Sequence, residues 1–258
     1  MLIIISPAKK LNINYSFDKN NISYPEFHEE ACELINILKS KSKQDLISLM
    51  KISDKIADLN IQRNTNFELT LNNSNSYPAA KLFNGEVYSG LDFTTMNNTE
   101  VSYAQKHLRI LSGLYGILKP LDLIQPYRLE MGSKLANAKG PNLYQFWQSI
   151  ITDKINSELK KHKAPYLINL ASNEYSKVIN SKNLNNKVIT INFKDVVNGH
   201  LKTIMIYAKM ARGLMAKTII INKIDNIELL KDLVINNYSY SQKHSNSDSE
   251  LVFIRTHE

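Results

Sequence analysis

The sequence predicts an α+β fold, in which helices cover a mixed sheet within a single domain of residues 1–258. Strand-like apolar runs are scattered among helical patterns, without the regular alternation of a βαβ fold. One hairpin signal is strong, because Asn198-Gly199 separates two apolar runs. The chain has 43% hydrophobic and 22% charged residues and no internal repeat, which favours one large core.

The first part of the chain is predicted to form a strand followed by helices. Leu2–Ile5 is a short β-branched run typical of a buried strand, and Pro7, which has no amide hydrogen, ends it. Pro25 suits the first turn of a helix, whose apolar residues recur at helical spacing from Phe27 to Leu38. Helical patterns follow over 43–51 and 53–64, and a polar connector over 65–78.

The middle of the chain is predicted to be helical at both ends and to turn repeatedly between them. Thr99 can cap a helix whose apolar face extends to Leu111. Residues 107–132 contain three glycines and two prolines, so this stretch must change direction several times. Pro141 opens a further helix that is amphipathic over 143–151.

The last part of the chain combines strands and helices. Ser172 can cap a short helix that follows a predicted strand. The expected elements are a strand over 165–170, a helix over 173–180, a hairpin over 188–206, a helix over 207–223 and a strand over 251–254.

The net charge of +8 comes from 32 Lys and Arg residues against 24 Asp and Glu residues. Such an excess favours an anionic partner, such as nucleic acid or a phosphorylated ligand. A general bias of the sequence towards Lys, Asn and Ile explains the charge equally well. Charge alone therefore leaves both interpretations open.

The expected location is the cytoplasm, and no membrane association is expected. Cys32 is the only cysteine, so no intrachain disulfide can form and a reducing compartment is favoured. The apolar run Leu2–Ile5 is too short for a signal-peptide core or a membrane span. A monomer is expected, because every apolar stripe has a plausible core partner.

Standard catalytic and cofactor signatures are missing from the sequence. It has neither a Walker loop nor a GxGxxG motif after a strand. The six histidines are scattered, and with one cysteine they do not predict a metal site. We therefore expect no cofactor and no bound metal; direct iron binding is a weaker hypothesis.

The loop after the first strand is the first candidate site. Lys9 and Lys10 follow Ser6-Pro7-Ala8, and loops at the carboxyl ends of strands often bind ligands in α/β folds. The two lysines could hold phosphates. The alternative is a solvated loop.

A glycine-rich stretch in the middle of the chain is the second candidate. Gly113 and Gly116, flanked by Arg109 and Lys119, resemble the hairpin of a helix-hairpin-helix motif, whose backbone amides approach DNA phosphates. The spacing is Gly-x-x-Gly instead of the usual Gly-x-Gly. The alternative is a structural turn between packed helices.

Three polar residues among apolar neighbours are candidates for chemistry. On a strand, Arg128 and Glu130 would point the same way, as a salt bridge or as an active-site pair. Ser172 follows a predicted strand, where it is either a helix cap or a ligand-binding or nucleophilic hydroxyl.

The late helix supplies the last candidates. Lys209 and Arg212 lie three residues apart and would share a basic face suited to phosphates. Lys217 lies beside the apolar stripe and either reaches solvent or faces a cleft. Gly213 costs about 1 kcal/mol in a helix relative to Ala, which suggests either close packing or the approach of a ligand there. An ordinary amphipathic helix explains these residues equally well.

Several blocks together resemble the YaaA family of peroxide-stress proteins, also called DUF328 or UPF0246. They occur in one order from end to end: MLIIISPAK, LMKISDKIA, FNGEVYSGL, HLRILSGLYGILKPLDLIQPYRLEMG, LYQFW, INLASNEY, YAKMARGLM and ELVFIR. The resemblance implies a single-domain fold special to the family, with a positively charged cleft and a helix-hairpin-helix-like DNA-binding element. It also implies a role in resisting hydrogen peroxide by limiting free intracellular iron and protecting DNA. Met210 stands where the family usually has a second lysine.

Two functional hypotheses follow. The first is a stress protein that binds double-stranded or distorted DNA through basic residues and the glycine hairpin, namely Lys9, Lys10, Arg109, Gly113, Gly116, Lys119, Lys209 and Arg212. The second is an enzyme of unidentified reaction, whose polar pocket would contain Arg128, Glu130, Ser172 and Lys217.

Overall fold

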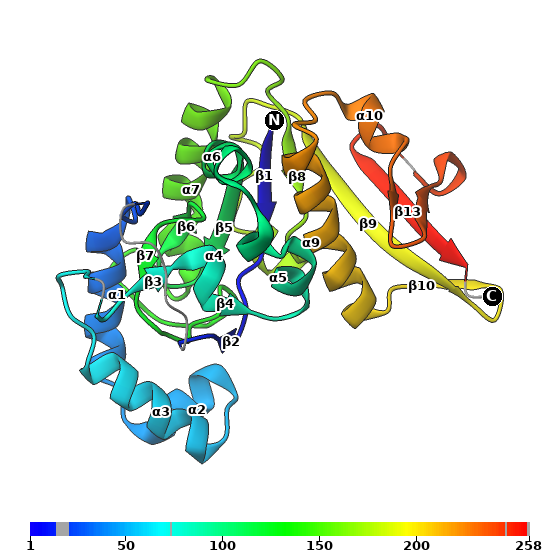
Figure 1. Cartoon of the computed structure of the whole chain (residues 1–258). Coiled ribbons are helices and arrows are strands. Elements are labelled where there is room, and N and C mark those ends of the chain that lie inside the picture. Colours follow the sequence, from blue (N-terminus) through cyan, green and yellow to red (C-terminus); the bar gives the residue numbers. More distant parts are fainter. Residues whose placement is uncertain (14–20, 73, 246, 257–258) are drawn as a thin grey trace.

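A mixed sheet crosses the molecule, and helices cover it (Figure 1). The computed structural model describes residues 1–13, 21–72, 74–245 and 247–256. Within these residues, nine strands form the main sheet. In spatial order they are β11 (Val234–Ile235), β12 (Tyr238–Tyr240), β13 (Glu250–Thr256), β9 (Val188–Val197), β8 (Leu167–Asn169), β1 (Leu2–Ile5), β5 (Leu108–Ser112) and β6 (Gly116–Leu118), with β10 (His200–Lys202) paired to β9.

The centre of the sheet is parallel and its margins are antiparallel. Strand β1 pairs in parallel with both β5 and β8, and β9 pairs in parallel with β8 and β13. Strands β6, β10 and β12 add antiparallel pairs. The predicted mixed sheet is therefore confirmed. Because the carboxyl ends of β1, β5 and β8 meet at one edge, residues distant in sequence are brought together there.

The helices are interspersed irregularly among the strands along the chain. Their bounds are α1 (His28–Lys39), α2 (Lys43–Met50), α3 (Asp54–Thr65), α4 (Ala79–Leu82), α5 (Glu86–Leu91), α6 (Asn98–His107), α7 (Leu143–Leu159), α8 (Asn173–Ser176), α9 (Met205–Ile221) and α10 (Ile227–Lys231). Two 3-10 turns lie at Phe93–Thr95 and Gln242–His244. Two small sheets pair β2 (Lys10–Leu11) with β4 (Phe83–Asn84), and β3 (Tyr77–Pro78) with β7 (Leu123–Ile124).

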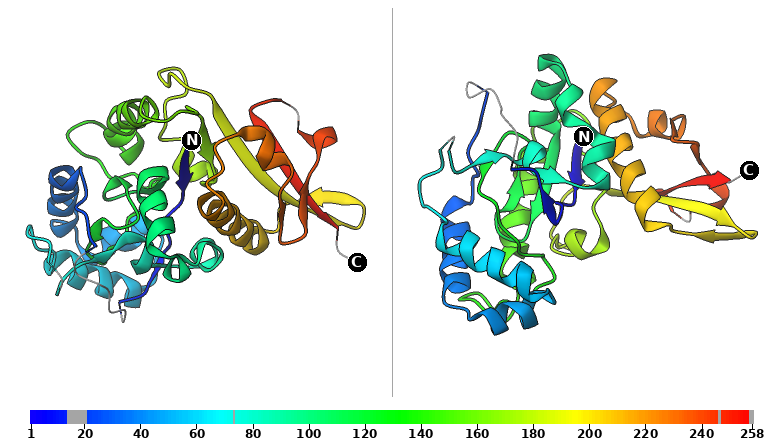
Figure 2. Two further views of the ribbon diagram at one scale, coloured as in Figure 1. Left: turned by 45° about the horizontal axis from the view of Figure 1, so that its top comes forward. Right: turned by 60° about the horizontal axis from the view of Figure 1, so that its bottom comes forward.

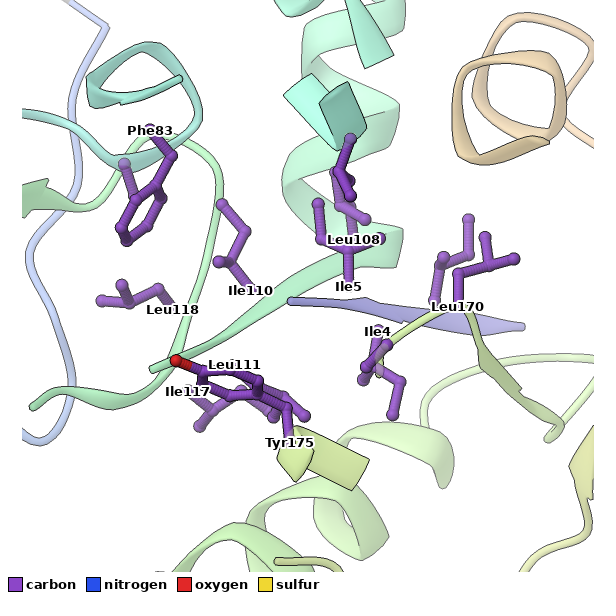
Figure 3. Packing of buried hydrophobic residues seen from close by; sticks show 14 of the residues in the cluster. Ile4, Ile5, Phe83, Leu108, Ile110, Leu111, Ile117, Leu118, Leu170 and Tyr175 are labelled. Atoms are coloured by element: carbon purple, nitrogen blue, oxygen red, sulfur yellow. The ribbon is translucent and has the colours of Figure 1, made fainter. Parts of the chain in front are cut away.

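The core explains why Leu2–Ile5 is apolar at every position. All four residues of β1 are fully buried, as expected for a central parallel strand covered on both faces. Figure 3 shows side chains of β1 and β5 packed together, with Phe83 on one side of them and Tyr175 on the other. Helices α1–α3 lie on one side of the molecule, and the ribbon of β9, β10 and β13 projects on the opposite side (Figure 2).

The predicted helix up to Leu111 ends earlier than expected. Helix α6 begins after Asn97, whose side chain accepts hydrogen bonds from two backbone amides, and it ends at His107. Residues 108–112 form β5 instead. Their apolar residues also fit a buried strand, and pairing with β1 decides between the two structures. The helix expected over 173–180 is likewise shorter, Asn173–Ser176.

The hairpin at Asn198-Gly199 is confirmed, although its second strand is only three residues long. Both turn residues have positive φ, 51° for Asn198 and 74° for Gly199. Helix α9 begins at Met205, inside the range predicted for the hairpin. Among the described residues, no helix is long and apolar enough to cross a membrane.

Candidate functional site

The carboxyl ends of β1 and β8 bring Ser6 and Ser172 into contact. The Ser6 Oγ accepts a hydrogen bond from the Ser172 backbone N–H at 2.8 Å and donates one to the Ser172 Oγ at 3.2 Å. Ser172 precedes α8 as predicted, but its hydroxyl forms no capping bond to the helix. Tyr88, from α5, donates to the Ser6 carbonyl at 3.1 Å. The structure thus places the Ser172 hydroxyl at this carboxyl edge of the sheet.

An irregular segment, Pro126–Gly132, carries Arg128 and Glu130 to the same region. It packs directly on the β5–β6 turn, where a side chain on Gly113 would collide with the Leu129 carbonyl oxygen. An Arg128 nitrogen lies 3.1 Å from a Glu130 carboxylate oxygen, and both side chains are largely buried, with 18% and 13% exposed. The expected salt bridge is present, although the segment is not a strand.

Lys9 joins this pair from the loop after β1. Its Nζ lies 3.3 Å from the Glu130 carboxylate, while 66% of its side chain stays exposed. Glu174, at the start of α8, accepts a hydrogen bond from the Gly132 N–H at 3.2 Å. We call the group Ser6, Lys9, Arg128, Glu130 and Ser172 the carboxyl-edge site.

Three buried tyrosines stand beside the carboxyl-edge site. Burial is the main cause that raises the pKa of Tyr88, Tyr127 and Tyr175, and nearby tyrosines or Glu130 raise it further. Hydrogen bonds with the Ser112 hydroxyl and the Met131 backbone oppose the rise in pKa at Tyr127 and Tyr175, respectively. The Tyr127 hydroxyl lies 2.7 Å from the Ser112 Oγ. Near neutral pH these tyrosines therefore stay uncharged and act as hydrogen-bond donors or acceptors.

Arg63 is a neighbour of the site that sequence analysis missed. It lies on α3 and is half-buried; burial and the charge of Arg128 both lower its pKa. Its place in an ordinary helical pattern carried no signal of function. Proximity to Arg128 arises only from the packing of α3 beside the 126–132 segment.

Lys217 does not join the other candidates for chemistry. Its Nζ lies 2.9 Å from the Asp92 carboxylate and 3.0 Å from the Thr95 hydroxyl. That partnership also lowers the pKa of Asp92. The structure therefore joins Arg128 and Glu130 with Lys9, places Ser172 against Ser6, and gives Lys217 a separate ion pair.

A basic groove lies at the opposite, amino-terminal end of β1. Its volume is about 760 Å³, and Met1 forms part of its lining. We call it the amino-edge groove. Its lysines come from α6, the loop after β6, α7, the loop after α7 and the loop after α9: Lys106, Lys119, Lys154, Lys161, Lys163 and Lys223.

Arg109 forms a buried wall of the amino-edge groove. Its Nε and one terminal nitrogen donate to the two Glu158 oxygens at 2.8 and 3.0 Å. Its other terminal nitrogen donates to the carbonyls of Leu108 and Gln105. Lys154 also contacts Glu158 and Glu26. The Arg109 guanidinium therefore donates its hydrogen bonds to groups of the protein itself. Lys119, the other predicted flanking cation, lies in the lining of the groove.

The helix-hairpin-helix expected around Gly113 and Gly116 is wrong at this position. Residues 108–118 form an antiparallel β hairpin in which Ser112 pairs with Gly116. Both glycines are buried: the Gly113 carbonyl accepts from the Trp147 indole N–H, and Gly116 faces the Trp147 ring. Their backbone is therefore enclosed by protein. Two short helices joined by three residues occur instead at α2 and α3.

An aromatic stack lines part of the amino-edge groove. The Tyr103 and His107 rings are stacked at 3.9 Å, and the His162 ring meets His107 edge-on at 4.6 Å. Burial lowers the pKa of His107 and lowers that of His162 to about 4, with the N-terminal amine adding to both shifts. Across the described part of the chain, no cluster of His, Cys, Asp and Glu is arranged to hold a metal ion.

The other predicted DNA-binding cations lie outside the groove. Lys10 is exposed on β2, next to the carboxyl-edge site in sequence. Lys209 is exposed on α9, whereas Arg212 is largely buried, which lowers its pKa. Lys209 and Arg212 were predicted to share a basic face. Of the two, Lys209 is the one exposed to solvent.

Comparison with known proteins identifies the family. A family model described as "Peroxide stress protein YaaA" matches residues 1–244. A UPF0246 protein of Aliivibrio fischeri is 48% identical over 99% of this chain and 98% of its own length. A UPF0246 protein of Marinomonas is 49% identical over 99% of this chain and 97% of its own length. A UPF0246 protein of Pseudoalteromonas translucida is 46% identical over 99% of this chain and 98% of its own length. The chain therefore belongs to the YaaA family of peroxide stress proteins.

Proposed function

We propose that this peroxide stress protein binds double-stranded or distorted DNA through the amino-edge groove. The observation that carries this proposal is the concentration of lysines from five segments around one hollow. Glu158 is already paired with Arg109 and Lys154, which leaves Asp225 as the other carboxylate of the lining. The groove therefore offers a surplus of positive charge to an anionic backbone.

Five groove lysines are available for phosphates. Among the described residues, none of them takes part in a salt bridge: Lys106, Lys119, Lys161, Lys163 and Lys223. Each phosphate neutralised contributes about −0.9 to the slope of log K against log salt concentration, so five contacts give a slope of about −4 to −5. Such contacts fix the backbone and carry little sequence preference.

Charge reversal inside and outside the groove tests the proposal. Lys161→Glu with Lys163→Glu should weaken binding of a duplex strongly and make the salt slope shallower by about 2. The matched control is Lys202→Glu with Lys243→Glu, which changes the charge equally on exposed residues outside the lining. Fluorescence anisotropy at several salt concentrations gives both quantities. An equal loss of duplex affinity in the two variants would mean that net charge alone causes it, and the groove would then be rejected as the binding site.

The pair α2–α3 provides a second test of where DNA binds. The family resemblance implies a helix-hairpin-helix element, and these helices are joined by a tight turn at Lys51, which has a φ of 51°. Lys51→Glu with Lys55→Glu should leave DNA affinity close to that of the unchanged protein. If this variant loses binding while the groove variant keeps it, the interface lies at α2–α3.

The cellular role follows from the same interface. We propose a cytoplasmic monomer that protects DNA during peroxide exposure and helps keep free iron low. In cells that lack the native gene, the groove variant should fail to restore survival in hydrogen peroxide, whereas the control variant should restore it. Electron paramagnetic resonance of chelated iron in the same cells measures the iron effect separately, and light scattering measures the oligomeric state.

Catalysis at the carboxyl-edge site is the second candidate function. What supports it is the ion-pair group of Arg128, Glu130 and Lys9, together with the contact between Ser6 and Ser172 at the neighbouring strand ends. DNA binding alone does not require a carboxylate between two cations, whereas acid–base chemistry does. Glu130→Gln should abolish peroxide protection without changing DNA affinity. Full protection by this variant would rule out an essential Glu130 reaction.

A further inference from the structure

Arg128 has a buried donor that no described residue uses. One terminal nitrogen contacts Glu130, but the Nε is buried and has no hydrogen-bond partner within the described residues. The Glu130 oxygen that faces Arg128 and Lys9 also lacks a well-oriented hydrogen bond in this part of the structure. A guanidinium has five N–H donors, and nearly all buried polar groups in folded proteins are satisfied. A buried ion pair with unsatisfied hydrogen-bonding groups, near the carboxyl edge of the sheet, therefore fits a site that a ligand completes.

Positive charge exceeds negative charge around Arg128. Lys9 reaches Glu130 from the solvent side, and Arg63 lies within electrostatic range on α3. Glu130 forms an ion pair with Lys9 and another with Arg128. Glu174 also lies at this edge, where it is committed to the Gly132 backbone. Three cations against these two carboxylates leave a surplus of positive charge, which favours an anionic ligand.

A small cavity adjoins this cationic group. Its volume is about 300 Å³, and Arg63 is part of its lining together with Gln125 and Pro126, which directly precede the segment that bears Arg128. Leu59 and Tyr77 add apolar surface to the same lining. Cavities of about this size hold small organic molecules, with apolar walls for bulk and a few polar groups for orientation.

We propose that the carboxyl-edge site binds a small phosphorylated molecule, whose phosphate is held by Arg128 with Lys9 and Arg63 and whose organic part enters the adjoining cavity. A phosphate group matches both the fork of donors on Arg128 and the sign of the excess charge. This inference takes its location from the second proposed function, needs no reaction, and is independent of DNA binding. The two anion sites lie at opposite ends of β1, with Met1 in the groove and Ser6 at the carboxyl edge.

Nuclear magnetic resonance signals of the arginine side chains report phosphate binding directly. The chain has five arginines, so a ¹⁵N Nε–H spectrum of arginine-labelled protein has at most five signals, and Arg128→Gln identifies its own by loss. Inorganic phosphate, titrated at constant ionic strength, should shift the Arg128 signal saturably. The other four signals in Arg128→Gln show whether that variant is folded.

Matched variants decide which site the phosphate occupies. Lys9→Gln should weaken the affinity about two- to fivefold, as expected for one exposed ionic contact. Glu130→Gln should strengthen it, because it removes the carboxylate that competes for Arg128. Lys161→Glu with Lys163→Glu, which tests DNA binding in parallel, should leave the Arg128 shift unchanged.

Three results would overturn the inference. They are an Arg128 signal that does not move, a movement that the groove variant abolishes, and an equal movement with acetate at the same ionic strength. Retained DNA binding in Arg128→Gln, together with lost phosphate binding, would keep the two sites separate. A groove variant that loses DNA but keeps the Arg128 shift would support the same separation.

Discussion

At the scale of single residues, the ion pair of Arg109 and Glu158 shows how a basic residue can look functional and act structurally. Its side chains are 6% and 7% exposed, and two parallel hydrogen bonds join them. Sequence analysis placed Arg109 among DNA contacts because it flanks a glycine-rich turn. Nothing local reveals Glu158, which lies 49 residues away and reaches Arg109 only after α7 packs beside β5.

Arg109→Ala should destabilise the protein by about 3–5 kcal/mol, because it leaves the buried Glu158 charge without its main partner. Urea unfolding monitored by circular dichroism measures the loss. The control is Lys231→Ala, which removes an exposed helix pair with Glu228 and should leave the midpoint nearly unchanged. If Arg109→Ala has a normal midpoint but reduced DNA affinity, Arg109 would be a binding residue after all.

His162 should make stability fall as the pH is lowered. Its pKa in the folded protein is about 4, below its ordinary value of 6.5, mainly because it is buried. Between these values the unfolded chain binds more protons than the folded one, so stability rises with pH and is lost on acidification. The partial exposure of the ring reduces the size of the effect through solvent screening.

The difference between parent protein and His162→Gln isolates this effect. The change in urea midpoint on going from pH 4.5 to pH 6.5 should be more positive in the parent than in His162→Gln. A difference is needed because Asp122, whose pKa burial raises to about 6, acts in the opposite direction over the same interval. Identical pH profiles for the two proteins would show that His162 is not the cause.

At the scale of elements, α5 and α9 approach so closely that side chains are excluded at their crossing. A Cβ on Gly213 would collide with the Val87 carbonyl oxygen, and one on Gly90 would collide with that of Met210. This confirms the close packing that Gly213 suggested in the sequence. The contact holds α9 against α5, the helix that supplies Tyr88 to the carboxyl-edge site.

Gly213→Ala should therefore destabilise the protein by about 1–3 kcal/mol, despite the better helix propensity of Ala. The matched control is Gly85→Ala: its φ of 165° suits any residue, and an added Cβ meets only ordinary contact with Ala8. Thermal unfolding of both variants measures the difference. Equal midpoints for the two would mean that the crossing can widen at little cost.

Elements were predictable where one local signal was sufficient. Asn198-Gly199 determined its hairpin, because both residues readily adopt positive φ. The stretch at 108–111 was misjudged, since its apolar residues satisfy helical and strand patterns alike and only pairing with β1 selects the strand. Candidate residues of the carboxyl edge were found individually. Their convergence depends on pairing among β1, β5 and β8, which no local pattern encodes.

At the scale of the whole molecule, the sheet connects regions that look separate in Figure 1. Strand β9 pairs with β8 in the central parallel group and, along seven positions, with β13 in the projecting ribbon. Inside the ribbon, Asp195 is fully buried and accepts hydrogen bonds from the Tyr238 hydroxyl at 2.7 Å and the Arg255 Nε at 2.9 Å. The ribbon therefore has a polar core of its own, and it is joined to the main body by β9 and by α9, whose Tyr207 ring lies against Arg255.

We propose that the chain nevertheless unfolds as one domain, because unfolding of the ribbon removes β9 from β8 and exposes the buried edge of β8. Trp147, the single tryptophan, reports on the main body, where its ring packs against Gly116 and Phe146. Its fluorescence and the far-ultraviolet circular dichroism should give coincident urea transitions. Asp195→Asn, which weakens the ribbon from within, should shift both transitions together. A variant in which circular dichroism changes before Trp147 fluorescence would show that the ribbon unfolds separately, and the single-domain assignment would fail.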